Sequence, residues 1–319
     1  MFAIETEDLT KDYLVGFWRP KPYRALDRLT LQVETGEVFG LLGPNGAGKS
    51  TTLKLLMGLI FPTSGAARIL GRPVGDRDVR RRFGFLPENP TFYDYLTAEE
   101  LLTYFAGLFG LRGTVRASRI AQVLDQVGIG AERRLKMRSY SKGMIQRVGV
   151  AQALLNEPEL VFFDEPMSGL DPIGRRDLRQ LILGLRDRGC TIVFSSHILS
   201  DAEALCSRVA IVAQGKLIAC GRLSDIVAFE PRGWELVVEL TSSEVIERLR
   251  PTLVSVIPLS AGRYALELPQ AAAPERLMQE ITAAGGRVVS LNPFRETLED
   301  YFVKAVGGTA PRDHTGVAP

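Results

Sequence analysis

The spacing of apolar residues predicts strands that alternate with helices over the first two thirds of the chain. Strands are predicted from apolar–polar alternation or from short apolar runs at 2–9, 29–34, 38–42, 160–163 and 191–194. Helices are predicted from apolar residues three or four positions apart at 50–60, over most of 97–129, at 142–155 and at 174–188. This alternation indicates an α/β fold, in which helices cover a parallel sheet.

Beyond about Leu223 the pattern changes to that of a small α+β domain. Strand, helix, strand, strand, helix and strand are predicted in turn at 234–240, 242–249, 254–258, 263–268, 274–284 and 287–291. This β-α-β-β-α-β order is typical of a ferredoxin-like domain. A last helix is predicted at 296–306, before a segment rich in Gly, Pro and Thr. We therefore expect domains at 1–222 and 223–306 and a disordered tail at 307–319.

Composition and charge narrow the classes of protein. The chain has 319 residues, with 39 basic and 37 acidic ones, so it lacks the basic excess typical of nucleic-acid-binding proteins. Its three cysteines show no CxxC spacing, so neither a disulfide framework nor a zinc site is indicated. No stretch reaches the roughly 18–20 apolar residues that span a bilayer, and the N-terminus lacks the apolar core of a signal peptide. We expect a cytosolic protein without a nucleic-acid partner, which reaches a membrane only through another protein.

The strongest chemical signal is a glycine-rich loop between a predicted strand and a predicted helix. Its sequence is Gly43-Pro44-Asn45-Gly46-Ala47-Gly48-Lys49-Ser50-Thr51, which matches the phosphate-binding (Walker A) pattern GxxxxGK[ST]. The glycines let several backbone N–H groups face phosphate oxygens, and the helix N-terminus adds a positive dipole end. Lys49 can reach the outer phosphates, and the Ser50 hydroxyl can bind Mg²⁺. The loop predicts binding of a nucleoside triphosphate with Mg²⁺.

Two further strand ends carry polar residues suited to phosphate chemistry. The apolar run 160–163 ends in Asp164, which can hold Mg²⁺ as a Walker B aspartate, and in Glu165, which can act as general base on water. Many strands end in acids, so this signal gains weight only behind a phosphate-binding loop. His197 follows the run 191–194 at the same predicted sheet edge and could donate to the γ-phosphate. A structural role is the alternative for an isolated histidine.

Together these residues resemble the nucleotide-binding domain of ATP-binding-cassette (ABC) proteins over roughly residues 2–222. Further matches are the signature motif at Ser141, Lys142, Gly143 and Met144, the D-loop at 168–171 with Asp171, the H-loop at 195–197, and Tyr13 as the aromatic that stacks on adenine. The resemblance implies a P-loop NTPase fold with a helical subdomain, which binds and hydrolyses ATP. It also implies a head-to-tail dimer of two such chains, or of this chain and a related ATPase subunit. Each ATP would then lie between the Walker A loop of one subunit and the signature of the other.

Two positions depart from the family pattern. The signature is SKGM where the family usually has SGGQ, so Lys142 either adds positive charge near the phosphates or is merely solvated. Glu88 stands where the family has the Q-loop glutamine. Its carboxylate could bind Mg²⁺ or orient water, although it adds negative charge near the phosphates.

Aromatic residues cluster around the predicted Q-loop and the helix that follows it: Phe92, Tyr93, Tyr95, Tyr104, Phe105 and Phe109. We expect most of them in the core. In the family this region forms the groove for a coupling helix of the membrane subunit, and we expect Phe92, Tyr93 and Tyr95 near it. The basic and aromatic stretch 15–24 is interpreted as a solvated hairpin tip, with a membrane or partner contact as the alternative.

The resemblance implies a transporter ATPase that drives export through a separate transmembrane permease. Such a subunit is peripheral on the cytoplasmic face of the cell membrane. One cassette with a short C-terminal domain is similar to exporter ATPases of the drug, polysaccharide or gliding-motility type, whose end the stretch 297–302 resembles. The alternative is a soluble ABC-type ATPase that acts on ribosomes or DNA, although such relatives usually carry two cassettes or long coiled coils. A GTPase is disfavoured because the sequence has no NKxD-type guanine-binding motif.

Overall fold

The computed structural model describes residues 1–16, 18–226, 231–240, 244–260, 262–269 and 272–295. It divides the chain into two compact units, Met1–Leu223 and Ser224–Pro319, which are described separately here. The helix predicted at 296–306 and the tail predicted at 307–319 lie outside the described residues. Among the described residues, no helix is both long and apolar enough to cross a bilayer.

A six-stranded sheet in the order β10-β9-β3-β8-β7-β6 forms the centre of the first unit. Its strands are β3 (Val38–Leu42), β6 (Phe83–Leu86), β7 (Leu160–Asp164), β8 (Thr191–Ser196), β9 (Arg208–Ala213) and β10 (Lys216–Arg222). All neighbours pair in parallel except β9 and β10, which pair antiparallel. The strands β3, β7 and β8 are buried along their whole length, as their apolar runs predict. The predicted α/β fold with a parallel sheet is confirmed.

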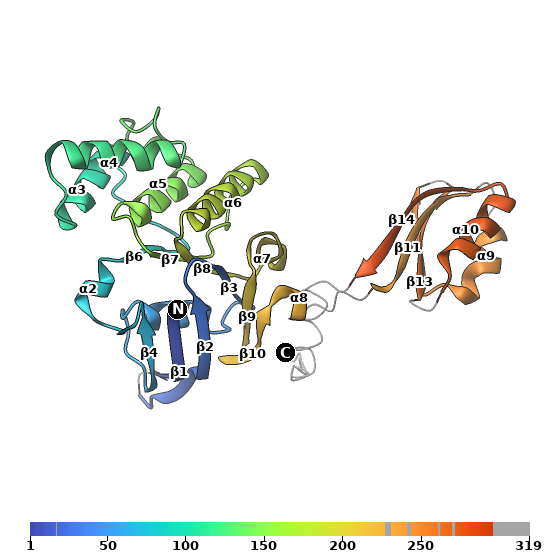
Figure 1. The fold of residues 1–319 in the computed structure, drawn as a ribbon, viewed down its shortest axis with the longest axis horizontal. Helices are drawn as coiled ribbons and strands as arrows, with labels where there is room; N and C mark the ends of the chain where they lie inside the picture. The colour runs from blue at the N-terminus through green and yellow to red at the C-terminus, as the bar shows by residue number, and fades with distance from the viewer. Residues whose placement is uncertain (17, 227–230, 241–243, 261, 270–271, 296–319) are drawn as a thin grey trace, which may run out of the picture. The chain divides into compact units, whose positions relative to one another are not determined.

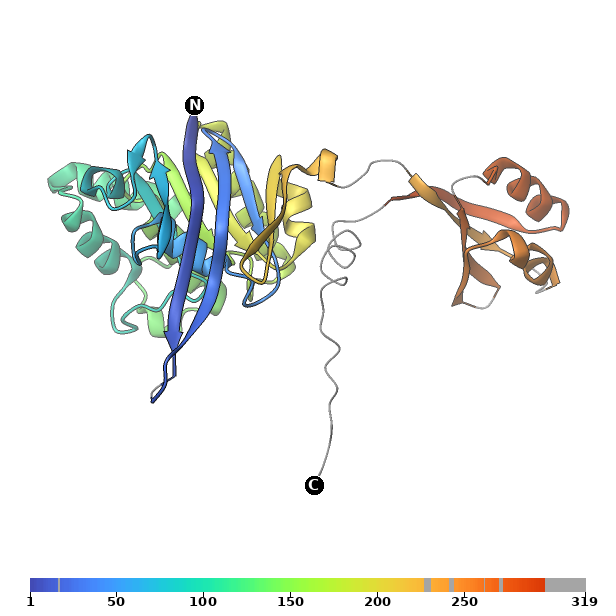
Figure 2. The ribbon, with the colours of Figure 1, turned by 90° about the horizontal axis from the view of Figure 1, so that it is seen from below.

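A second, antiparallel sheet has the order β2-β1-β4-β5. Its strands are β1 (Phe2–Val15), β2 (Lys21–Glu34), β4 (Ser64–Ile69) and β5 (Arg72–Pro73). The strands β1 and β2 form a hairpin much longer than predicted, which Figure 2 shows as two long strands side by side. Its outer part is largely exposed and lacks apolar alternation. It is held instead by backbone pairing and by polar contacts such as that of Arg24 with Asp12, 2.9 Å apart.

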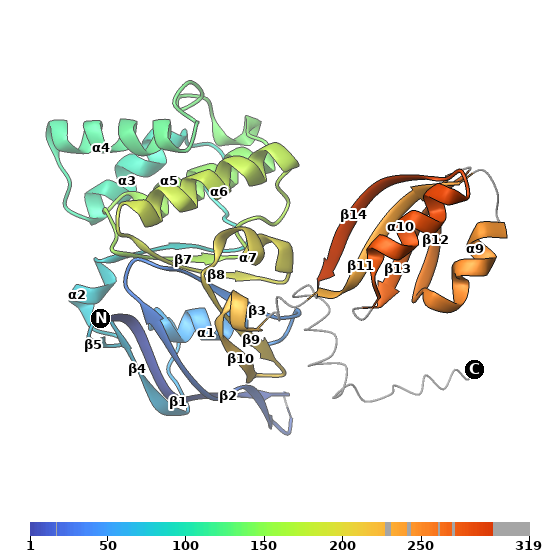
Figure 3. The same cartoon turned by 45° about the vertical axis from the view of Figure 1, so that its right-hand side comes forward.

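Helices cover both faces of the parallel sheet. The helices of this unit are α1 (Lys49–Leu56), α2 (Arg77–Arg80), α3 (Ala98–Leu108), α4 (Gly113–Gln126), α5 (Lys142–Leu154), α6 (Pro172–Asp187) and α7 (Leu199–Leu205), with a 3₁₀ turn at Met137–Ser139. The short helix α8 (Leu223–Ile226) begins at the last residue of this unit and has no buried residue. Figure 3 shows α1 between the two sheets, while α5 and α6 lie on the other face of the parallel sheet. The helix α1 ends four residues earlier than predicted, because Gly58 adopts the left-handed conformation that terminates helices (φ 65°).

The helices α3, α4 and α5 form a helical part beside the sheet (Figure 1). The helix α3 begins with the predicted capping box: Glu100 N–H donates to Thr97 Oγ1 at 3.1 Å, and Thr97 N–H donates to the Glu100 carboxylate at 2.8 Å. Both backbone donors are thereby satisfied, which fixes the start of the helix.

The prediction that most aromatics of this region are in the core is wrong. Tyr93, Tyr95, Tyr104 and Phe109 are exposed by 66%, 62%, 63% and 38%. Phe92 and Phe105 are half-buried. Tyr104 lies on α3, which buries its other face through small and aliphatic residues, Ala98, Leu101, Leu102 and Ala106, whereas Tyr93 and Tyr95 precede this helix.

The second unit follows the predicted β-α-β-β-α-β order. Its elements are β11 (Pro231–Glu239), α9 (Glu244–Leu249), a 3₁₀ turn at Arg250–Thr252, β12 (Ser255–Ser260), β13 (Arg263–Pro269), α10 (Pro274–Ala283) and β14 (Arg287–Arg295). Its strands pair antiparallel in the order β12-β13-β11-β14. The helices cover one face of this sheet, where Ile246 and Ile281 pack on Leu236, Val238 and Leu266. This unit therefore has a hydrophobic core of its own.

Candidate ATP-binding site

The glycine-rich loop follows β3 and leads into α1, as its sequence predicts. Gly43 (φ 156°) and Gly48 (φ 108°) have conformations that L side chains rarely adopt. A Cβ on Gly43 would lie 2.1 Å from the Val212 carbonyl oxygen, and one on Gly48 would lie 2.6 Å from the Ala25 carbonyl oxygen. Neighbouring backbone therefore packs directly on the loop and fixes its shape.

The loop borders a pocket of about 400 Å³. The pocket is lined by Pro44–Thr51 together with Tyr13, Tyr23, Ala25, Glu88 and Glu165. Of the residues predicted to bind ATP, Tyr13 and nearly all of the loop therefore lie around one cavity. Glu88 lines this cavity too, and it is exposed.

Lys49 and Glu165, with His197 beside them, form a charged cluster at the phosphate-binding loop. The Lys49 ammonium donates to the carbonyl oxygens of Gly43 (2.7 Å) and Pro44 (3.2 Å) and lies 3.1 Å from Glu165 Oε1. The other carboxylate oxygen, Oε2, is 2.9 Å from His197 Nδ1. The side chains of Lys49 and Glu165 are only 6% and 8% exposed, so each ion has its partner inside the protein. The carboxylate is thus held between two nitrogen groups beside the phosphate-binding loop.

Asp164 and Ser50 meet at the same edge of the sheet. The Ser50 hydroxyl donates to Asp164 Oδ1 at 3.2 Å. Hydroxyl and carboxylate oxygens are ligands that Mg²⁺ prefers, and Mg²⁺ is commonly held by one or two carboxylates together with substrate phosphates. Within the described ranges no group of three or more His, Cys, Asp or Glu residues could hold a metal. The residues present fit an ion that nucleotide phosphates help to bind.

The signature and the D-loop adjoin each other at a different pocket, of about 520 Å³. Ser141 caps the start of α5, where its hydroxyl accepts from Met144 N–H at 3.2 Å, and Asp171 caps the start of α6, where it accepts from Gly174 N–H at 2.7 Å. The exposed Lys142 side chain extends over Gly169, close enough that a Cβ there would lie 2.6 Å from its Nζ. This pocket contains Ser141–Met144 and shares no lining residue with the pocket at the phosphate-binding loop.

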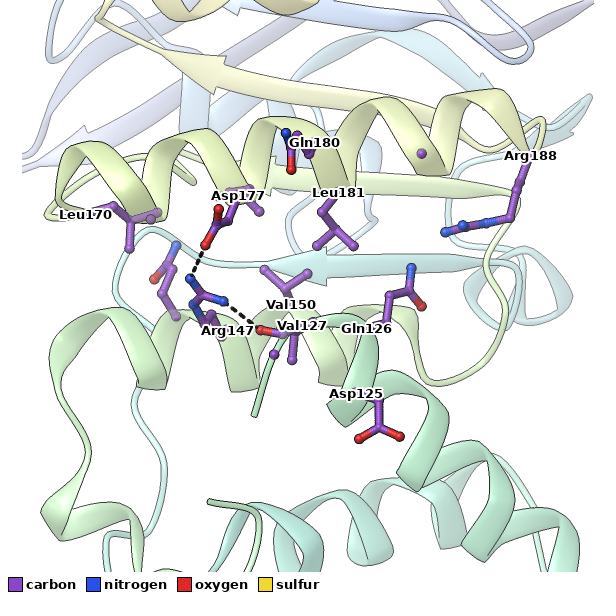
Figure 4. A pocket seen from close by; sticks show the side chains of 15 residues that line it. Asp125, Gln126, Val127, Arg147, Val150, Leu170, Asp177, Gln180, Leu181 and Arg188 are labelled. Atoms are coloured by element: carbon purple, nitrogen blue, oxygen red, sulfur yellow. Dashed lines mark hydrogen bonds and ion pairs between the residues drawn. The ribbon is translucent and has the colours of Figure 1, made fainter. Parts of the chain in front are cut away.

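Arg147, four residues after the signature glycine, ties three helices together at a cleft of about 420 Å³. Figure 4 shows its guanidinium on α5 pointing toward α6 and the end of α4. It donates to the Val127 carbonyl oxygen at 3.0 Å and to Asp177 Oδ2 at 2.9 Å. These contacts link the helix that carries the signature to the helix that follows the D-loop.

Two residues of the site were missed from the sequence. Tyr23 lines the ATP-loop pocket because the β1–β2 register places it directly opposite Tyr13. Extending the predicted strand pairing to the end of the hairpin would have placed Tyr23 beside Tyr13. Ser195 contacts both Asp164 and Glu165, because β7 and β8 pair with Asp164 opposite Ser195. Ser195 entered the sequence analysis only as part of the H-loop.

Comparison with known proteins identifies the class. Residues 26–168 match the family model of ABC transporters. An uncharacterised ABC transporter ATP-binding protein of Synechocystis sp. is 43% identical over 95% of this chain and 84% of its own length. The bacitracin transport ATP-binding protein BcrA of Bacillus licheniformis is 35% identical over 96% of this chain and 97% of its own length. The linearmycin resistance ATP-binding protein LnrL of Bacillus subtilis is 32% identical over 88% and 93%.

Similar solved structures belong to the same class of protein as these relatives. The ATP-binding subunit of an ABC transporter is 37% identical, with a TM-score of 0.61 over 70% of this chain and 91% of that one. An ATP-binding cassette solved as a dimer in a post-hydrolysis state, with ADP and Pi, is 27% identical, with a TM-score of 0.63 over 69% and 98%. The chain belongs to the ABC transporter ATP-binding proteins, a family of P-loop ATPases. It is the ATP-binding subunit of an ABC transporter, so the ribosome- or DNA-acting alternative is not favoured.

Proposed function

We propose that this chain drives export through a separate transmembrane permease by ATP-dependent dimerisation. The observation that carries the proposal is the division of the site: the phosphate-binding loop and the signature border two different pockets of one chain. A second copy, or a related ATPase subunit, would bring its signature to the first pocket. The direction of transport rests on relatives whose names refer to bacitracin transport and linearmycin resistance.

In this proposal the charged cluster rearranges when ATP binds. Phosphate oxygens take over the Lys49 ammonium, which now contacts loop carbonyls and Glu165 Oε1. Glu165 keeps its contact with His197, 2.9 Å away, and accepts a proton from the attacking water as general base. In this proposal His197 orients that carboxylate and would donate to the γ-phosphate.

The remaining residues of the site are assigned to Mg²⁺ and to the γ-phosphate. Ser50 and Asp164 would hold Mg²⁺, which would supply positive charge to the phosphates of the nucleotide. Glu88 reaches the same pocket and is a further candidate ligand. Across the dimer, Ser141 and the Gly143 N–H at the start of α5 contact the γ-phosphate.

We assign to the permease a surface made of exposed apolar and aromatic residues between the Q-loop and the end of α3. This surface consists of Tyr93, Tyr95, Tyr104, Leu108 and Phe109, each at least 38% exposed. Tyr93 and Tyr95 lie 5.6 Å apart between ring centroids, seven residues or fewer beyond Glu88 of the Q-loop. Exposed aromatic groups of this kind mark interaction sites. Docking there would place the chain on the cytoplasmic face of the cell membrane.

The test is ATP hydrolysis by this chain together with a multispan membrane protein that co-purifies with it, reconstituted in lipid vesicles. Substitution of both Tyr93 and Tyr95 by Ala is expected to abolish stimulation of hydrolysis by the permease while basal hydrolysis persists. Trp18→Ala, which removes an even more exposed aromatic (90%) between β1 and β2, serves as the control. Full stimulation of the double variant, or its loss in the control, would reject this docking surface.

A further inference from the structure

Ser195 is a buried hydroxyl at the centre of the Walker B region. It is the second-last residue of β8, lies directly opposite Asp164 of β7 and is 0% exposed. Its Oγ accepts from the Glu165 backbone N–H at 2.9 Å and donates to Asp164 Oδ1 at 2.5 Å. One hydroxyl therefore touches both acids to which metal binding and proton transfer are assigned.

The two contacts fix the direction of the hydroxyl proton. A serine hydroxyl has one proton, and a backbone N–H can only donate, so the Ser195 proton points to Asp164. The same carboxylate oxygen lies 3.2 Å from the Ser50 hydroxyl. Ser195 thus orients the Asp164 carboxylate toward Ser50. Ser50 belongs to the phosphate-binding loop. Hydrogen bonds to a metal-binding carboxylate typically set its orientation and basicity.

The second contact holds an unusual backbone conformation. Glu165 has a φ of 48°, in the left-handed region that non-glycine residues rarely adopt. That turn brings its carboxylate back to Lys49 and His197 rather than onward along the chain. Such conformations persist only where surrounding contacts hold them, and Ser195 receives the N–H of the strained residue.

We propose that Ser195 is a positioning residue for ATP hydrolysis, which aligns Asp164 for Mg²⁺ and holds Glu165 in its catalytic turn. The proposal rests on the roles of Asp164 and Glu165 given under the proposed function. It adds that the residue two positions before the H-loop histidine acts on the Walker B acids themselves.

The experiment compares Ser195→Ala with a matched control on the same strand. Thr191 is also buried (1% exposed), and its hydroxyl also accepts a backbone N–H, that of Gly36 at 2.9 Å, but at the other end of β8. Ser195→Ala is expected to lower kcat by about 10–100-fold, and Thr191→Val to leave kcat within about twofold of the parent. Ser195→Thr keeps a hydroxyl and should restore most of the rate.

A binding measurement separates positioning from a general loss of structure. A fluorescent ATP analogue is titrated with and without Mg²⁺ against the full chain. Without Mg²⁺, Ser195→Ala should bind like the parent, while the gain in affinity that Mg²⁺ provides should shrink by about tenfold. Thr191→Val should keep the full gain.

Three outcomes would overturn the proposal: an unchanged Mg²⁺ response in Ser195→Ala, an equal loss of kcat in Thr191→Val, or no recovery in Ser195→Thr. If Ser195→Ala does not fold, Ser195→Cys keeps a side chain of the same shape with a weaker donor and should give an intermediate loss of kcat. A parent-like rate in Ser195→Cys would then reject the proposal. Glu165→Gln measured in parallel separates a failure of this inference from a failure of the proposed function. Native turnover by that variant would refute the proposed general base.

Discussion

Arg147 should connect the stability of the helical part to ATP-driven dimerisation. Arg147→Ala removes two hydrogen bonds made by a charged donor, one to the Val127 carbonyl and one to Asp177. The bond to the carbonyl is worth about 1.5 kcal/mol. The ion pair adds only about 0.5 kcal/mol, because its side chains are 31% and 37% exposed and water screens them. We expect Arg147→Ala to lower the free energy of unfolding by about 2 kcal/mol and Asp177→Ala by about 0.5 kcal/mol.

Arg147→Ala should weaken dimerisation without changing nucleotide binding by a single chain. Arg147 does not line the pocket at the phosphate-binding loop, so ATP affinity of the monomer should stay unchanged. It does position α5, which presents the signature, so the Kd of the ATP-bound dimer should rise by about tenfold, equivalent to about 1.4 kcal/mol.

The assay is urea unfolding followed by ATP hydrolysis over a range of protein concentrations. Arg186→Ala, which breaks an exposed ion pair on α6, is the matched control and should change neither quantity appreciably. The reasoning is refuted if Arg147→Ala dimerises like the parent, or if Asp177→Ala destabilises the chain as much as Arg147→Ala does.

Three further predictions concern the pocket and the helical part. Lys49→Ala should weaken ATP binding at least tenfold, because the phosphates lose their buried cation; parent-like affinity in a fluorescence titration would contradict this. Tyr23→Ala should reduce affinity for both ATP and GTP by about fivefold, since a second aromatic beside Tyr13 stacks on any purine; a loss confined to one nucleotide would argue against stacking. The hydrogen bond from Thr97 N–H holds the pKa of Glu100 below its usual value. The ionised carboxylate therefore stabilises the fold fully at pH values above the usual pKa, and this stabilisation is lost as the pH falls through the lowered pKa. The melting temperature of Glu100→Gln should therefore depend less on acid pH than that of the parent, and parallel profiles would show that ionisation of Glu100 contributes nothing to stability.

The parts of the fold that were predicted from sequence are those in which local physics and burial agree. The phosphate-binding loop was recognisable because backbone packing at Gly43 and Gly48 excludes every other residue. The buried strands were recognisable because they are apolar on both faces. Thr97 and Glu100 marked the start of α3 because the capping box is a local contact.

The parts that escaped prediction depend on partners distant in sequence or on exposure. Aromatic residues after the Q-loop were expected inside because aromatics usually are, yet α3 turns its smaller residues inward. The outer half of the β1–β2 hairpin has no apolar alternation, so Tyr23 could not be placed opposite Tyr13. Ser195 meets Asp164 only through the register of β7 and β8, which no local pattern encodes.

The most direct test of the central claim, a composite ATP site made by two chains, is the mass of Glu165→Gln in solution by light scattering. With ATP and Mg²⁺ the variant should form a dimer of about 70 kDa, twice the 35.1 kDa of one chain. With ADP it should be a monomer, and adding Gly143→Asp should abolish the ATP-dependent dimer by placing a negative charge where the γ-phosphate is received. A monomer with ATP, or a dimer that persists with ADP or with Gly143→Asp, would contradict a composite site made by two copies of this chain.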